Sequence, residues 1–131
     1  MLALTSCLHK RGVDESAKRP IGRVLSITDS LLMSGGSDTI RLGVMGSGEQ
    51  LVFNYNLKNN SGSNLVILGH EVTCGCIRLE YDNKPVKSGE FIPMKVNFDS
   101  RGLYDWQLKL FRLQLYGAKA PILVYVEAQV E

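Results

Sequence analysis

The chain has 131 residues, 44% hydrophobic content and a net charge of +2, which suits one domain with its own core but not two. The small net charge is weak as a footprint for nucleic-acid binding, and no apolar run approaches the roughly 20 residues of a membrane-spanning helix. The three cysteines are too few for a small fold built on disulfides.

The first seven residues resemble the end of a bacterial lipoprotein signal. Leu4-Thr5-Ser6-Cys7 has the form of a lipobox, in which a leucine and two small residues precede a cysteine. In proteins with this motif the cysteine is acylated and becomes the mature N-terminus, so the resemblance implies lipidation of Cys7. We interpret residues 1–7 as the remnant of a signal whose complete form also has a basic region and an apolar stretch. The alternative is a free cysteine in a tail.

Residues 8–38 are predicted to form a tether or N-terminal arm. Leu8 to Arg23 is polar with a basic bias and has no sustained hydrophobic period, as expected of a solvated linker. Val24 to Met33 is expected to be a short strand or a packed arm. Surface-exported lipoproteins of the Bacteroidetes type carry acidic residues just after the cysteine. Here Leu8 to Arg11 is basic, and by resemblance to those lipoproteins this implies an anchor that faces the periplasm and not the cell surface.

From Thr39 to Glu131 the apolar residues recur with a period of two, which is typical of half-buried β-strands. Clusters of glycine, asparagine, serine and proline separate the runs. The pattern predicts about seven strands, no convincing helix and an all-β, immunoglobulin-like β-sandwich. The predicted core comprises Leu42, Val44, Phe53, Tyr55, Leu57, Ile67, Val72, Met94, Val96, Phe98, Leu113, Val124 and Val126.

The stretch from Leu65 to Tyr81, LVILGHEVTCGCIRLEY, is predicted to be a central strand with two irregularities. A bulge at Gly69 would switch the alternation, and the strand must bend near Gly75 because the phase changes again after it. Between these points the alternation places four side chains on one face: His70, Val72, Cys74 and Cys76.

Two later strands also carry irregular features. Pro93 cannot donate to a hydrogen-bond ladder, which predicts an edge strand or a bulge. The alternation slips between Leu110 and Phe111, which predicts another bulge. Trp106 begins this strand in phase with Leu108, which favours a core position.

Tyr104 and Trp106 are the candidates for partner contact. They follow a loop, where binding residues are often displayed, and large aromatic side chains frequently anchor a partner peptide or glycan. The competing interpretation is the core position of Trp106.

Several short motifs together resemble a bacterial immunoglobulin-like domain of unknown function. In chain order they are Tyr55-x-Leu57-x-Asn59, Leu65-x-Ile67, Cys74-Gly75-Cys76, Pro85-Val86-Lys87-Ser88-Gly89-Glu90 and Val96-x-Phe98-Asp99. The family is common in secreted proteins and lipoproteins of Bacteroidetes, and its fold is similar to ASH (ASPM and Hydin-type) and major sperm protein domains. The resemblance spans Thr39 to Glu131 and implies an interaction or assembly module with no established catalytic activity. The chain departs from the usual pattern at His70 and Ile77, where a branched apolar residue and a threonine are usual.

Cys74 and Cys76 are chemically the most unusual pair. In an extended strand their side chains share a face, with Cα atoms roughly 6.5–7 Å apart, the outer limit for a disulfide. Four interpretations remain open. The pair forms two buried apolar thiols beside a glycine, or a local disulfide in an oxidising compartment. With His70 it offers a soft-metal site, and redox catalysis is the fourth, although a strand lacks the helix N-terminus that lowers a thiol pKa.

The sequence indicates no catalytic site and no cofactor. Its only histidines are His9 and His70, and no glycine-rich phosphate loop lies between a strand and a helix. We therefore expect a non-catalytic lipoprotein module of the bacterial cell envelope that binds a protein partner, for example by sheet-edge pairing, and binds the membrane through its lipid but no nucleic acid. The alternative is a periplasmic thiol or soft-metal protein that uses the two cysteines.

Overall fold

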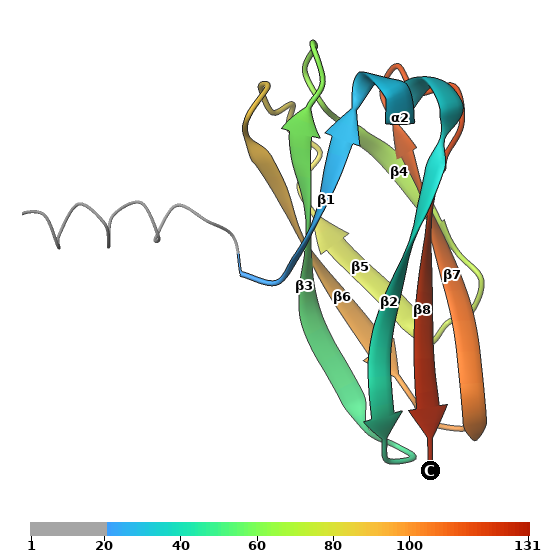
Figure 1. Cartoon of the computed structure of the whole chain (residues 1–131). Helices are drawn as coiled ribbons and strands as arrows, with labels where there is room; N and C mark the ends of the chain where they lie inside the picture. The colour runs from blue at the N-terminus through green and yellow to red at the C-terminus, as the bar shows by residue number, and fades with distance from the viewer. Residues whose placement is uncertain (1–20) are drawn as a thin grey trace, which may run out of the picture.

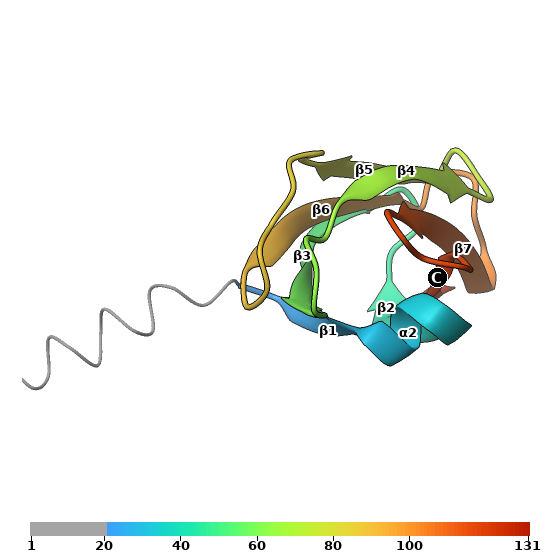
Figure 2. The ribbon, with the colours of Figure 1, turned by 90° about the horizontal axis from the view of Figure 1, so that it is seen from above.

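The computed structural model describes residues 21–131, and within them the chain forms a β-sandwich of eight strands and one short helix (Figure 1). The elements are β1 (Arg23–Thr28), α2 (Asp29–Ser34), β2 (Gly36–Met45), β3 (Gln50–Asn60), β4 (Ile67–Val72), β5 (Ile77–Tyr81), β6 (Phe91–Asp99), β7 (Asp105–Leu115) and β8 (Ile122–Val130). Sheet A has the strand order β1-β3-β6-β5, and sheet B has the order β2-β8-β7-β4. Seen from above, the two sheets face each other as two layers (Figure 2). The predicted all-β sandwich is confirmed.

The inward faces of the two sheets share one apolar core. Tyr55, Phe98 and Phe111 are its largest fully buried side chains, and the rings of Tyr55 and Phe111 meet edge to face with centroids 6.2 Å apart. Burial of one large apolar side chain stabilises the fold by roughly 1.5–3 kcal/mol. Most residues of the predicted core are buried or pack against it.

Two predicted core residues lie outside it. Val44 is 70% exposed and Val72 is 38% exposed. The pairing of β2 with β8 shifts between Arg41 and Val44, and Gly43 has a positive φ of 79°. This bulge reverses the alternation, so that Met45 rather than Val44 enters the core.

The N-terminal arm joins the sandwich, and the predicted domain boundary at Thr39 falls inside β2. Strand β1 pairs in parallel with β3, and the buried side-chain amide of Asn56 donates to the carbonyl oxygens of Ile21 (2.8 Å) and Arg23 (3.2 Å). Val24 to Met33, expected to be a short strand or a packed arm, contributes both the strand β1 and the helix α2, which Thr28 caps by accepting the Leu31 N–H. No helix within residues 21–131 is long and apolar enough to span a membrane. Cys7 and the rest of residues 1–20 lie outside the described part.

The segment from Leu65 to Tyr81 forms two strands in different sheets instead of one bent strand. Strand β4 belongs to sheet B and β5 to sheet A. The register shift between Ile67 and Gly69 agrees with the predicted bulge at Gly69. The bulge predicted between Leu110 and Phe111 is absent, because β7 pairs with β8 in one register from Asp105 to Leu113.

Pro93 lies in β6, which is an inner strand of sheet A and not an edge strand. It pairs with Asn56 on one side. On the other side, the pairing of β5 with β6 ends at Met94. At Pro93, β6 therefore has only one neighbouring strand among the described residues. The missing N–H of Pro93 costs no ladder hydrogen bond there, although β6 is not an edge strand as a whole.

A polar cluster bridges β1, β2 and β3 at one open side of the sandwich. The Asp38 carboxylate accepts hydrogen bonds from the Arg23 guanidinium (2.6 and 2.9 Å) and from the Tyr55 hydroxyl (2.9 Å). The hydrogen bond from Arg23 holds the pKa of Asp38 below its usual range, and burial is the main reason that the pKa of Tyr55 is raised. The ionised form of Asp38 is thus favoured by folding.

Because the pKa of Asp38 is lower in the folded protein, its contribution to stability is present above about pH 4 and is lost as the pH falls through the folded pKa. We expect Asp38→Asn to lower the urea midpoint at pH 7. When the pH is then lowered to about 3, the midpoint of the variant should fall less than that of the unaltered protein. The comparison is Asp99→Asn, because among the described residues the Asp99 carboxylate pairs only with Arg101, two residues away, and links no second strand. Its effect on the midpoint at pH 7 should therefore be smaller than that of Asp38→Asn. An unchanged acid dependence in the Asp38 variant would contradict this role.

Candidate functional site

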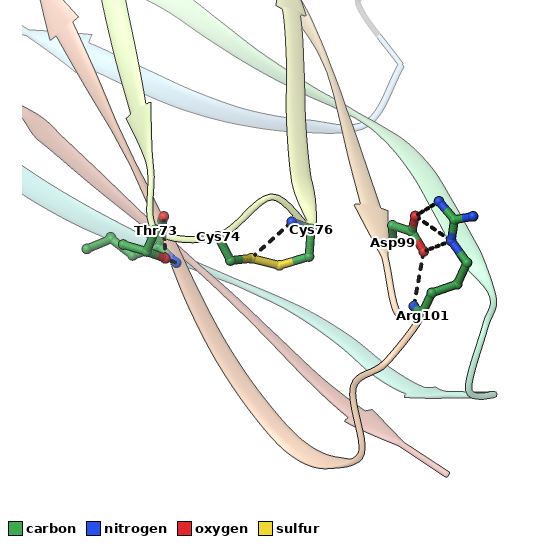
Figure 3. Close-up of a disulfide and its surroundings, with 6 residues drawn as sticks. Thr73, Cys74, Cys76, Asp99 and Arg101 are labelled. Atoms are coloured by element: carbon green, nitrogen blue, oxygen red, sulfur yellow. Dashed lines mark hydrogen bonds and ion pairs between the residues drawn. A yellow bond between two sulfur atoms is a disulfide. The ribbon is translucent and has the colours of Figure 1, made fainter.

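The chain crosses from sheet B to sheet A at Thr73–Cys76, between β4 and β5 (Figure 3). Both ends of the crossing are held by hydrogen bonds. The Thr73 N–H donates to the Leu110 carbonyl at 3.1 Å, and the Leu110 N–H donates to Thr73 Oγ1 at 3.1 Å. At the other end, the Asp99 N–H donates to the Cys76 carbonyl at 2.8 Å. The crossing therefore has a defined path between β7 and β6.

In the structure a disulfide joins Cys74 to Cys76, whose Cα atoms are 5.2 Å apart. This separation is shorter than a fully extended Cys-Gly-Cys segment allows, because the cysteines lie in a turn and not in a strand. Both side chains are half-buried and pack against the core. Of the four interpretations of the pair, this arrangement favours the local disulfide.

His70 is directed to Tyr81 and not to the cysteines. Its Nδ1 lies 2.7 Å from the Tyr81 hydroxyl, and the two rings meet edge to face with centroids 5.5 Å apart. Burial raises the pKa of Tyr81. Within residues 21–131 no three or more His, Cys, Asp or Glu side chains gather as metal ligands. The structure does not assemble the predicted soft-metal set of His70, Cys74 and Cys76.

The outer face of sheet B carries an unusual number of apolar side chains. Register places Trp106 beside Gln129, Leu108 beside Glu127 and Leu110 beside Tyr125. We call this surface the apolar face, and it consists of Val44, Trp106, Leu108, Leu110, Leu123 and Tyr125. The outer face of sheet A is more polar, although Val24 (43% exposed) and Val52 (57% exposed) also lie on it. Its polar residues are Asn54, Lys58, Arg78, Glu80, Lys95 and Asn97.

Trp106 is a surface residue, which corrects the expectation of a core position. It is 55% exposed and Leu108 is 45% exposed. The Trp106 indole N–H donates to Glu127 at 2.9 Å, and Glu127 also pairs with Arg41 at 3.3 Å. These contacts orient the indole on the sheet while leaving much of its surface in water. Tyr104 is also exposed, in the loop before β7.

Sequence reasoning missed the apolar face, although a signal for it was present. In β7, Trp106, Leu108 and Leu110 point outward and the residues from Phe111 onward alternate inward. The sequence pattern predicts a bulge at this slip, but an unbroken strand with apolar residues in both phases is apolar on both faces. Strand β8 repeats the signal, since Leu123 and Tyr125 alternate with buried Ile122 and Val124.

The fold is shared with domains of several larger proteins. The Vibrio cholerae protease VesB superposes with a TM-score of 0.55 at 16% identity, over 71% of this chain and 30% of that protein. A Porphyromonas gingivalis W83 protein of unknown function gives 0.60 at 13%, over 70% and 43%. The secreted Vibrio cholerae serine protease VesC gives 0.56 at 12%, over 69% and 21%. The chain thus spans less than half of each of these proteins, and the likeness is one of fold alone.

The family of the chain follows from its sequence. Residues 33–130 match the model of the family described as "Protein of unknown function (DUF1573)". The chain therefore belongs to this family, whose description assigns no activity. No curated protein matches the chain in sequence.

We expect protein purified from an oxidising compartment to have an intact mass lower by two hydrogen atoms than the reduced chain, and to resist alkylation at Cys74 and Cys76 until a reductant is added. Because the closed loop has only three residues, chain-entropy arguments give the bond about 1.5 kcal/mol of stability. Cys74→Ser with Cys76→Ser should lower the urea midpoint accordingly. An unshifted mass, with alkylation only after unfolding, would instead indicate two buried thiols.

Proposed function

We propose that the chain is a non-catalytic interaction or assembly module of the bacterial cell envelope, and that the apolar face binds its protein partner. The observation that supports this is the difference between the two outer faces. Sheet A presents mainly charged and amide side chains to water, with only Val24 and Val52 as large exposed apolar residues among the described ones. Sheet B presents Trp106, Leu108 and Val44 together with the half-buried Leu110, Leu123 and Tyr125. Clustered, exposed apolar side chains on a soluble domain commonly mark a protein-interaction site.

The composition of the apolar face suits a protein partner. Trp and Tyr are frequent among the residues that dominate interface energies, and Trp106 is held in place by Glu127. A side chain that is already oriented loses less conformational entropy when a partner covers it. The Arg41–Glu127 pair gives the same surface a polar element that can specify orientation.

The second candidate function is a periplasmic thiol protein, which the half-buried Cys74–Cys76 disulfide favours. The two proposals differ in what they require of the sulfur atoms. An interaction module that uses the apolar face keeps its partner after Cys74→Ser with Cys76→Ser, whereas a thiol protein loses its activity with that change.

A photo-cross-linking amino acid in place of Leu108 is expected to give adducts with a partner protein when the chain is expressed in bacterial cells and exported to their envelope. The same amino acid in place of Lys95, which is exposed on the outer face of sheet A, is the matched control and is expected to give few. The measurement is the yield and identity of adducts by mass spectrometry. Equal yields at the two positions, or none at Leu108, would contradict the proposed binding surface.

The proposed envelope location depends on Cys7, which lies outside the described residues. If Cys7 is acylated, the protein is recovered in the membrane fraction and its intact mass includes the acyl groups. We expect Cys7→Ser to move the protein to the soluble fraction without a change in its thermal unfolding. A Cys7→Ser variant that stays with the membrane would contradict a lipid anchor at this position.

A further inference from the structure

The edge of β7 is only half covered. Strand β4 pairs with β7 from Leu115 to Phe111, and Thr73 adds its bonds to Leu110. There the chain leaves for sheet A, and among the described residues no other strand pairs with β7 on this side. The segment Asp105–Lys109, which we call the open edge, is therefore bonded to β8 alone.

The backbone groups that face the open edge can be identified from Leu110. Its N–H and C=O both point to Thr73, away from β8. In a strand, the backbone groups of every second residue point to the same side. The N–H and C=O of Leu108 and Trp106 therefore face the open edge, and such groups are a template for another strand.

We infer that the open edge pairs with the open edge of a second copy of this chain, in an antiparallel arrangement about a twofold axis at Gln107. This inference rests on the proposed interaction function and names one partner for it. In an antiparallel ladder, residues whose free groups face the edge must pair with each other. A twofold axis at Gln107 pairs Trp106 of each copy with Leu108 of the other.

Charge complementarity selects this register. With the axis at Gln107, Asp105 of each copy lies opposite Lys109 of the other, so two opposite-charge cross-strand pairs form. An axis at Leu108 would pair Trp106 with Leu110, whose edge groups are already used by Thr73. A lysine on an edge strand ordinarily discourages pairing. Here the residue that faces Lys109 in the second copy is Asp105, whose charge is opposite.

The apolar side chains and the ends of the edge suit the same arrangement. The exposed Trp106 and Leu108 side chains of the two copies meet across the new strand pair on the outer face. At one end the edge is limited by Thr73, and at the other the chain turns away at Asp105, whose φ is 65°. Each copy thus presents a short edge of matching length, and the two B sheets join into one continuous sheet.

The first test is disulfide trapping in the full chain with Cys7→Ser, which prevents cross-linking through Cys7. Facing Gln107 residues would have Cα atoms about 4.5 Å apart as a non-hydrogen-bonded pair, so Gln107→Cys is expected to form a covalent dimer under mild oxidation. The matched control is Gln114→Cys, on the part of β7 that β4 covers. Gln114 is more exposed than Gln107, so random collisions would favour the control. Cross-linking of the control at the same rate would overturn the inference.

The second test measures self-association of the full chain, again with Cys7→Ser, by sedimentation velocity over a wide concentration range. Lys109→Glu is expected to weaken the dimer by about tenfold, since it makes both charge pairs repulsive. A mixture of Lys109→Glu and Asp105→Asn chains should associate more tightly than the Lys109→Glu chain alone, because the heterodimer restores one Asp105–Lys109 pair. Lys95→Glu, the same charge change on sheet A, should have no effect.

The outcomes separate this inference from the proposed function. A chain that stays monomeric at every concentration overturns the twofold pairing. If Leu108 photo-adducts then contain a different protein, the interaction function stands with another partner. If Leu108 gives no adduct as well, both proposals fail. Photo-adducts that contain a second copy, together with rapid Gln107→Cys trapping, support both.

Discussion

The path of the chain between its two sheets is the constraint on which the other features depend. Apart from the β5–β6 and β7–β8 pairs, consecutive strands lie in different sheets, so the chain repeatedly crosses the end of the sandwich. The crossing at Thr73–Cys76 has only four residues and contains the disulfide. It ends the pairing of β4 with β7 at mid-strand and leads into β5, and a disulfide joins its two cysteines. A strand cannot pair in both sheets at once, and so the remainder of the β7 edge is left without a neighbour among the described residues.

The two sides of the sandwich where the sheets do not pair are each closed by polar side chains. Asp38 links Arg23 to Tyr55 at the side of β1 and β2, and His70 meets Tyr81 at the side of β4 and β5. At the side of β1 and β2, the hydroxyl of the buried Tyr55 and the half-buried Asp38 carboxylate would be costly without a hydrogen bond. These pairs therefore act as cross-sheet contacts in which each group satisfies another, and they leave the apolar core to the interior faces. His70 is close to the cysteines in sequence, but its side chain contacts Tyr81 across the two sheets and not the cysteines.

The apolar face and the open edge adjoin each other on β7, so one partner can contact both of them. An exposed apolar surface by itself favours association without specifying geometry. Backbone groups at a strand edge impose direction and register on whatever pairs with them. Trp106 and Leu108 contribute to both, because their side chains lie on the apolar face while their backbone groups face the open edge. A partner that uses both features is therefore held in one orientation.

The all-β class, most of the core and the bulge at Gly69 could be predicted from the sequence, because a period of two and turn residues are local properties of the chain. The sequence did not reveal that β1 and α2 belong to the domain, since a parallel pairing with β3 depends on residues more than thirty positions away. Trp106 was misplaced for a similar reason: apolar residues in both phases of β7 are compatible with a bulge or with a strand that is apolar on both faces, and only its continuous pairing with β8 decides between them. The relation of Cys74 to Cys76 was likewise decided by tertiary structure, because the two residues are adjacent in a turn that exists only where the chain passes from one sheet to the other.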